Sequence, residues 1–102
     1  MEKLNKENFD EVINSDKLTL VDFSASWCMP CKMFKPIVEE FAEKDKSIQV
    51  FGVDIDEEEE IAMRYRIFSV PTLLLFKNGE KIDTSVGLLT YDDLVDFVNK
   101  NK

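Results

Sequence analysis

The chain has 102 residues, of which 44% are hydrophobic and 33% are charged, as expected for one soluble globular domain spanning residues 1–102. Its 13 basic and 21 acidic residues give a formal net charge of −8, which argues against nucleic acid and anionic membranes as partners. No apolar run approaches the ~20 residues of a membrane span, and the first residues lack a signal-peptide pattern, so we expect a cytoplasmic protein.

The first half of the chain alternates between apolar runs and helical patterns. Phe9, Val12 and Ile13 recur at helical spacing, and Asn5 is a candidate cap for that helix. The apolar, β-branched runs of this half are typical of buried strands. In chain order we expect a short strand within residues 2–5, a helix within 5–15, a strand at 18–24, a helix at 30–44 and a strand at 48–55.

The second half predicts a helix, a hairpin and a final helix. Asp56 is the expected cap of the first of these helices, with the acidic residues 57–60 in its first turn, where the helix dipole favours anions. Asn78-Gly79 is a strong signal for a two-residue hairpin turn. Thr90 is placed to cap the last helix. The expected elements are a helix after residue 56, strands at 72–76 and 80–86, and a helix at 90–100.

This order of elements predicts an α/β fold. Strands joined by helices pair in parallel, whereas strands joined by a tight turn pair antiparallel. We therefore expect a mixed central sheet of about five strands, with a parallel core and a C-terminal antiparallel hairpin, flanked by about four helices.

The only two cysteines, Cys28 and Cys31, lie three positions apart in the stretch "SASWCMPCK". A structural zinc site takes four ligands, and this chain offers two cysteines and no histidine, so only a site shared between chains would suffice. A structural disulfide is a weak alternative, because so small a loop removes little chain entropy and the cytosol would reduce it. A redox couple is the interpretation that fits each position.

The expected strand-to-helix turn explains why a redox couple fits. Cys28 follows a strand and Pro30 lies near the first helical position. Unpaired backbone N–H groups and the helix dipole then favour the thiolate of Cys28, which is the nucleophilic form. Cys31 lies one turn later at a separation of ~5–6 Å, which matches the Cα spacing of a disulfide.

The chain resembles the thioredoxin family over nearly its whole length. "VDFSASWCMPCKMFKP" is similar to the family's active-site stretch, "FSVPTLLLFKNGEK" to its proline loop and hairpin, and "VGLL" to its glycine loop. The resemblance implies the thioredoxin fold and a thiol-disulfide oxidoreductase that reduces protein disulfides through a reversible Cys28–Cys31 couple.

The resemblance also implies roles for individual residues. Cys28 is expected to be the exposed attacking cysteine, and Cys31 the buried resolving one. Asp22 corresponds to a buried carboxylate that exchanges a proton with Cys31, and its burial among apolar neighbours should raise its pKa. The expected docking surface for substrates comprises Trp27, Met29, Pro30, Phe68, Val70, Pro71 and Gly87, with a cis bond at Val70-Pro71 and the Val70 backbone pairing with an extended substrate.

Three positions depart from the family pattern. Met29 replaces the usual glycine between the cysteines, which leaves the reduction potential open. Gly52 stands where many relatives place a lysine or glutamate near the buried acid, and it can neither pair with nor repel Asp22. Phe68 stands where an arginine is frequent, and it either enlarges the docking surface or folds back over the core.

We expect a monomeric enzyme with no metal and no bound cofactor, since the chain lacks a nucleotide-binding glycine fingerprint. Its expected partners are disulfide-containing target proteins and a flavin-containing thioredoxin reductase as electron donor. Three alternatives remain: a specialised electron donor to one dedicated target, a binding module on the same fold in which turnover is incidental, and a glutaredoxin-like enzyme that glutathione alone would reduce. The paired cysteines argue against the binding module, because a clamp has no need of a resolving thiol.

Overall fold

The computed structural model describes residues 1–102 and contains five strands and four helices. They follow the order predicted from the sequence, β-α-β-α-β-α-β-β-α. In chain order the elements are β1 (Glu2–Lys3), α1 (Phe9–Ile13), β2 (Thr19–Ser24), α2 (Met29–Lys44), β3 (Gln49–Asp54), α3 (Glu59–Arg64), β4 (Thr72–Lys77), β5 (Glu80–Val86) and α4 (Tyr91–Asn99).

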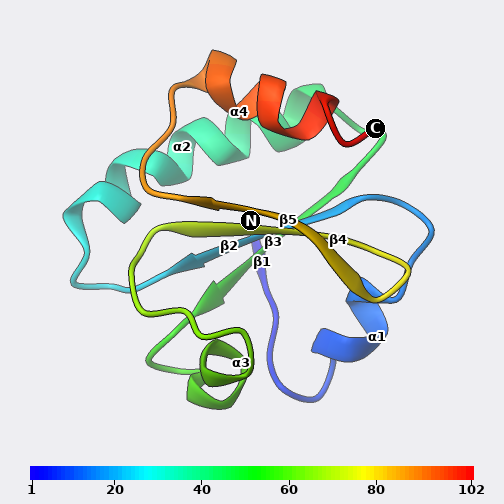
Figure 1. The fold of residues 1–102 in the computed structure, drawn as a ribbon. Coiled ribbons are helices and arrows are strands. Elements are labelled where there is room, and N and C mark those ends of the chain that lie inside the picture. The colour runs from blue at the N-terminus through cyan, green and yellow to red at the C-terminus, as the bar shows by residue number, and fades with distance from the viewer.

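The strands form one mixed sheet in the order β1-β3-β2-β4-β5. β1 and β2 both pair with β3 in parallel, whereas β4 is antiparallel to both β2 and β5. Helices α2 and α4 cover one face of the sheet, and α1 and α3 lie on the other (Figure 1). The predicted α/β fold, with a parallel core and a C-terminal antiparallel hairpin, is therefore confirmed.

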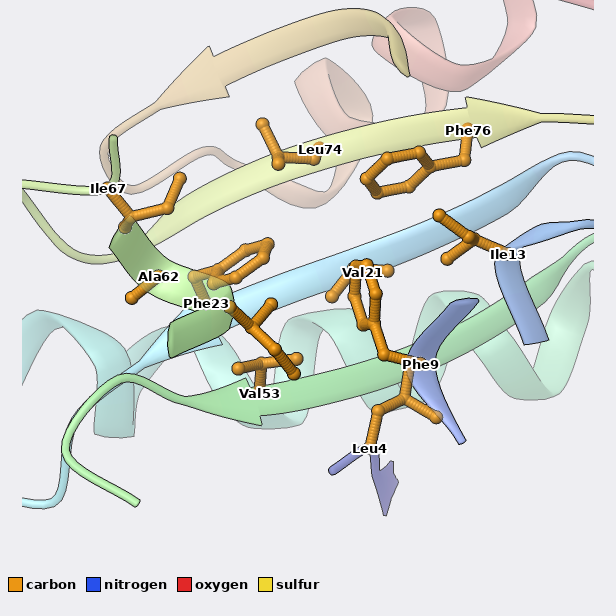
Figure 2. Close-up of a cluster of buried hydrophobic side chains, with 11 residues drawn as sticks. Leu4, Phe9, Ile13, Val21, Phe23, Val53, Ala62, Ile67, Leu74 and Phe76 are labelled. Atoms are coloured by element: carbon orange, nitrogen blue, oxygen red, sulfur yellow. The ribbon is translucent and has the colours of Figure 1, made fainter. Parts of the chain in front are cut away.

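Each face of the sheet buries its own apolar cluster, because successive strand residues point to opposite faces. Val21 and Phe23 of β2 pack with Leu74 and Phe76 of β4 on the α1–α3 face (Figure 2). On the other face, Leu20 packs with residues of α2 and α4. The two clusters hold the central strands rigidly, and the carboxyl end of β2 leads directly into the cysteine pair.

Two of the predicted helix starts are wrong. α1 begins at Phe9, and the side chain of Asn5 instead accepts hydrogen bonds from backbone N–H groups in the turn before it, including that of Asn8 at 3.0 Å. α3 begins at Glu59 rather than directly after Asp56. Asp54 is the residue whose carboxylate accepts the N–H of Asp56, at 2.8 Å, so the acidic segment first forms a turn and only then a helix.

The other local signals agree with the structure. The hydroxyl of Thr90 accepts a hydrogen bond from the N–H of Asp93 at 3.1 Å and caps α4. Asn78 and Gly79 both have positive φ, as the predicted turn requires. None of the helices has the length and apolar character that crossing a membrane requires.

Candidate active site

The cysteine pair lies where β2 ends and α2 begins. Cys28 is the N-cap of α2, and Pro30 lies in the first turn, where a missing N–H costs no helical hydrogen bond. The N–H of Cys31 points at Cys28 Sγ, with 3.2 Å between the nitrogen and the sulfur. The two sulfurs form a disulfide, and the Cα atoms are 5.3 Å apart, within the range expected from the sequence. A helix N-terminus aimed at Cys28 stabilises negative charge on that sulfur when the disulfide opens.

The expected difference in exposure between the two cysteines is absent in this disulfide form. Cys28 is 4% exposed and Cys31 is 5% exposed. The cysteine pair packs against Val70, whereas the neighbouring Trp27 and Met29 are exposed. The expectation of an exposed Cys28 is therefore wrong for the oxidised protein.

The Val70–Pro71 segment precedes β4 and faces the disulfide at the same end of the sheet, where β2 ends. The carbonyl oxygen of Val70 is 3.7 Å from Cys28 Sγ, and the Val70–Pro71 peptide bond is cis, as the resemblance implied. Neither the N–H nor the carbonyl of Val70 takes part in a backbone hydrogen bond. A free donor and a free acceptor beside the reactive sulfur are what an extended substrate needs in order to pair with the backbone.

Asp22 is a buried carboxyl in the middle of β2. It is 3% exposed, and its Oδ1 has no hydrogen-bond partner. Desolvation by burial raises the pKa of Asp22 to about 7, because the charged form loses its water without gaining a partner. A carboxyl with this pKa exchanges protons readily near neutral pH.

Asp22 and Cys31 line the same cavity, which has a volume of about 260 Å³. Gly52, opposite Asp22 in the register of β2 and β3, forms part of its wall. A Cβ atom at Gly52 would make an ordinary contact with the Met1 sulfur at 3.6 Å, so the Met1 side chain packs beside this glycine. The cavity brings Asp22 and Cys31 to one space, while Oδ1 of Asp22 is itself shielded from solvent.

Three large apolar side chains of the expected docking surface are exposed. Trp27 is 68% exposed and its Nε1 donates a hydrogen bond to Asp56 at 2.8 Å, which fixes the orientation of the ring. Met29 is also exposed, and Phe68 is 87% exposed. Phe68 thus does not fold back over the core, which decides between the two interpretations of this residue.

Gly87 follows β5 and lies beside the proline loop. Its N–H donates to the carbonyl of Pro71 at 2.8 Å, and its φ of +100° is a conformation that favours glycine. No heavy atom lies within 4 Å of a Cβ built at this position, so the space next to the loop is open.

Comparison with known proteins decides the family. The thioredoxin family profile matches residues 1–100, and a curated thioredoxin of Rickettsia bellii is 46% identical over 93 residues, covering 90% of this chain and 89% of its own. The chain belongs to the thioredoxin family. With its disulfide-forming cysteine pair it is a thiol-disulfide oxidoreductase of the protein-disulfide reductase type.

Other thioredoxins match this chain over most of its length. A thioredoxin of Chlamydia trachomatis is 40% identical over 99 residues, covering 97% of this chain and 96% of its own. Among solved structures, a Plasmodium falciparum thioredoxin superposes with a TM-score of 0.93 at 32% identity, with both chains fully covered. A thioredoxin of Malassezia sympodialis superposes with a TM-score of 0.88 at 36% identity, covering 94% of this chain and 87% of that one.

Two features of this thioredoxin-family site escaped the sequence analysis. Asp56, expected as a helix cap, instead holds the indole of Trp27. Met1 fills the space beside Gly52 although 51 positions separate them in the chain. Both contacts depend on the packing of distant segments, so local sequence patterns do not predict them.

Proposed function

We propose that this protein reduces disulfides in target proteins, with Cys28 as the attacking sulfur and Cys31 as the resolving sulfur. The observation that carries the proposal is the position of the disulfide at the N-terminus of α2, opposite the unpaired backbone of Val70. The helix N-terminus favours the thiolate at Cys28, and the Val70 backbone offers hydrogen bonds to a target strand.

The reaction proceeds in two exchanges. The Cys28 thiolate attacks one sulfur of the target disulfide; a mixed disulfide forms and the other target sulfur leaves as a thiolate. The Cys31 thiolate then attacks Cys28 Sγ, the Cys28–Cys31 disulfide forms, and the second target sulfur is released. The target gains two electrons and the protein loses two.

Asp22 is proposed to accept the proton that Cys31 loses before the second exchange. Asp22 and Cys31 line one cavity, and a carboxyl with a pKa of about 7 takes up or releases a proton under the conditions of the reaction. The charged form of Asp22 is costly because its Oδ1 has no partner, so the ionised carboxylate readily takes the proton.

The docking surface is proposed to combine apolar contact with backbone pairing. Trp27, Met29 and Phe68 supply exposed apolar area around the disulfide. Pro30, Val70, Pro71 and Gly87 shape the backbone on either side of it, and the open space at Gly87 leaves room for a target strand.

The proposed setting is that of a single-domain cytoplasmic monomer. The formal net charge of −8 favours protein targets over nucleic acid or anionic membranes. A flavin-containing thioredoxin reductase is the proposed electron donor, because a carrier that gives two electrons to each target needs an enzyme to restore its dithiol.

Insulin reduction with dithiothreitol tests this function. The wild type should accelerate precipitation of the insulin B chain, whereas Cys28→Ser should show only the background rate of dithiothreitol. A Cys28→Ser protein as active as the wild type would rule out Cys28 as the attacking group. An inactive wild type would leave only a binding function for the fold.

A further inference from the structure

We propose that a groove beside the proline loop binds an acidic and apolar extended segment of the target protein, next to the target's disulfide. This inference rests on the proposed function and adds a specificity to it. The groove has a volume of about 170 Å³ and lies between the 65–69 segment and β5. Its walls include Phe68 and Val86, which are both largely exposed.

The charge of the groove is opposite to that of the chain. Arg66 and Lys81 line it, and none of its ten lining residues is acidic, although acids outnumber bases by 21 to 13 in the whole chain. Neither cation takes part in any of the six salt bridges. Two unpaired cations beside exposed apolar carbons suit a segment that carries a carboxylate and an apolar side chain.

The shape of the groove suits an extended chain. The groove opens on the α1–α3 face of the sheet, where Thr84 and Val86 of β5 lie opposite Leu74 and Thr72 of β4, and all four line it. An extended segment that lies along this face can place alternate side chains on the apolar wall.

The proline loop connects the groove to the active site. The Gly87 N–H donates to the Pro71 carbonyl at 2.8 Å, and the Thr72 hydroxyl donates to the Ser69 carbonyl at 2.7 Å, so the proline loop is tied to both walls. Val70, whose carbonyl oxygen is 3.7 Å from Cys28 Sγ, lies between the disulfide and the groove in the same loop. A target strand that pairs with Val70 is thereby directed toward Arg66 and Lys81.

The backbone of Arg66 has a fixed, left-handed conformation. Its φ is +55°, and its N–H donates to the Met63 carbonyl at 3.1 Å at the end of α3. Asparagine also tolerates this left-handed conformation, so Arg66→Asn removes the charge without adding strain. Lys81→Gln removes the second charge from β5 with little change in shape.

The test uses peptides that carry one cysteine in a disulfide with 2-mercaptoethanol. One series carries leucine and glutamate at successive positions on either side of the cysteine, and a matched series carries lysine in place of glutamate. The measured quantity is the ratio of kcat/KM for each glutamate peptide to that for its lysine partner. We expect a preference of roughly twofold to fivefold at one offset, the size of an exposed ion pair, decreasing in 0.5 M salt.

The variants identify the source of that preference. Arg66→Asn combined with Lys81→Gln should remove it, whereas Lys17→Gln combined with Lys46→Gln, which removes the same charge elsewhere, should keep it. Equal ratios in all proteins, or a preference that survives loss of Arg66 and Lys81, would overturn the groove proposal. So would a dimer that dissociates in the groove variant, because the occupant would then be a second copy of the chain.

A neutral control separates this inference from the proposed function. If the wild type reduces 2-hydroxyethyl disulfide and all peptides without preference, the function stands and the groove proposal fails. If it reduces no disulfide at all, the function itself fails.

Discussion

Asp22 of β2 lies directly opposite Gly52 of β3, and the side chain that is missing at Gly52 leaves the buried carboxyl without a partner from this neighbour. Ionised Asp22 therefore lowers the stability of the fold, while the same group is proposed to serve catalysis. Stability and activity should respond in opposite directions when Asp22 is changed.

The first prediction concerns the pH dependence of that cost. The pKa of Asp22 is about 7 in the folded protein and ~3.9 in an unfolded chain, so the folded state binds the proton more tightly. The stability that protonated Asp22 gives the folded state is fully present below the unfolded pKa, and it is lost as pH rises through about 7. The loss approaches ~4 kcal/mol at pH 9, at 1.36 kcal/mol per pKa unit. Asp22→Asn should thus gain stability relative to the wild type as pH rises from 4 to 9.

Denaturant midpoints of the oxidised proteins measure this gain, and stopped-flow kinetics of mixed-disulfide resolution measure the cost in activity. Asp22→Asn should slow resolution, since an amide cannot accept the Cys31 proton. A stability difference that does not change with pH would mean that Asp22 keeps an ordinary pKa in the fold. An unchanged resolution rate would remove Asp22 from the mechanism.

The second prediction places a cation beside Asp22. Gly52→Lys should lower the pKa of Asp22 below about 7, because a nearby positive charge favours the carboxylate. Gly52→Gln is the matched control, with a side chain of similar reach but no charge. The Asp22 carboxyl signal, followed by NMR across pH, reads the pKa directly. Equal titration curves for the two variants would show that residue 52 does not reach the carboxyl.

The third prediction compares two glycines. Gly87→Ala should destabilise the protein by ~1–3 kcal/mol, because a φ of +100° is strained for any residue with a Cβ. Gly52→Ala should be tolerated, since Gly52 does not have positive φ and the added Cβ would make only ordinary contacts at 3.6 Å or more. Urea unfolding of both variants measures the two losses of stability. Equal midpoints would contradict the claim that Gly87, but not Gly52, needs a conformation that favours glycine.

The sequence predicted the order of the elements and the pairing of the cysteines well, because those features depend on local patterns. The β-branched runs around Val21 and Val53 predict buried strands, and the asparagine-glycine turn predicts the hairpin. The burial of Asp22 followed from its apolar neighbours in β2. These signals lie within a few residues of the features that they predict.

The remaining features depend on contacts that no pattern of residue types predicted. The start of α3 is set by Asp54, whose carboxylate binds the turn that follows it, and Cys28 is buried in a cluster packed against the distant Val70. The left-handed Arg66 is equally hidden, because arginine carries no preference for that conformation. Hydrophobic periodicity and composition do not predict such contacts.

The fourth prediction concerns Met29, the departure between the cysteines. Met29 is exposed and uncharged, so it favours neither redox state strongly. We expect a reducing couple near −270 mV, and Met29→Gly should shift it by at most ~30 mV. Equilibration with glutathione buffers measures both proteins. A wild-type potential near −120 mV would reverse the assigned direction of electron flow.

The most direct test of the central claim is to trap the intermediate of the two-step exchange. Cys31→Ser leaves Cys28 able to attack but removes the resolving sulfur, so incubation with insulin should yield a stable adduct, visible by mass, that dithiothreitol cleaves. Cys28→Ser, the matched control, should yield little adduct under the same conditions. Equal adduct from both variants, or adduct from Cys28→Ser alone, would contradict the assignment of Cys28 as the attacking sulfur.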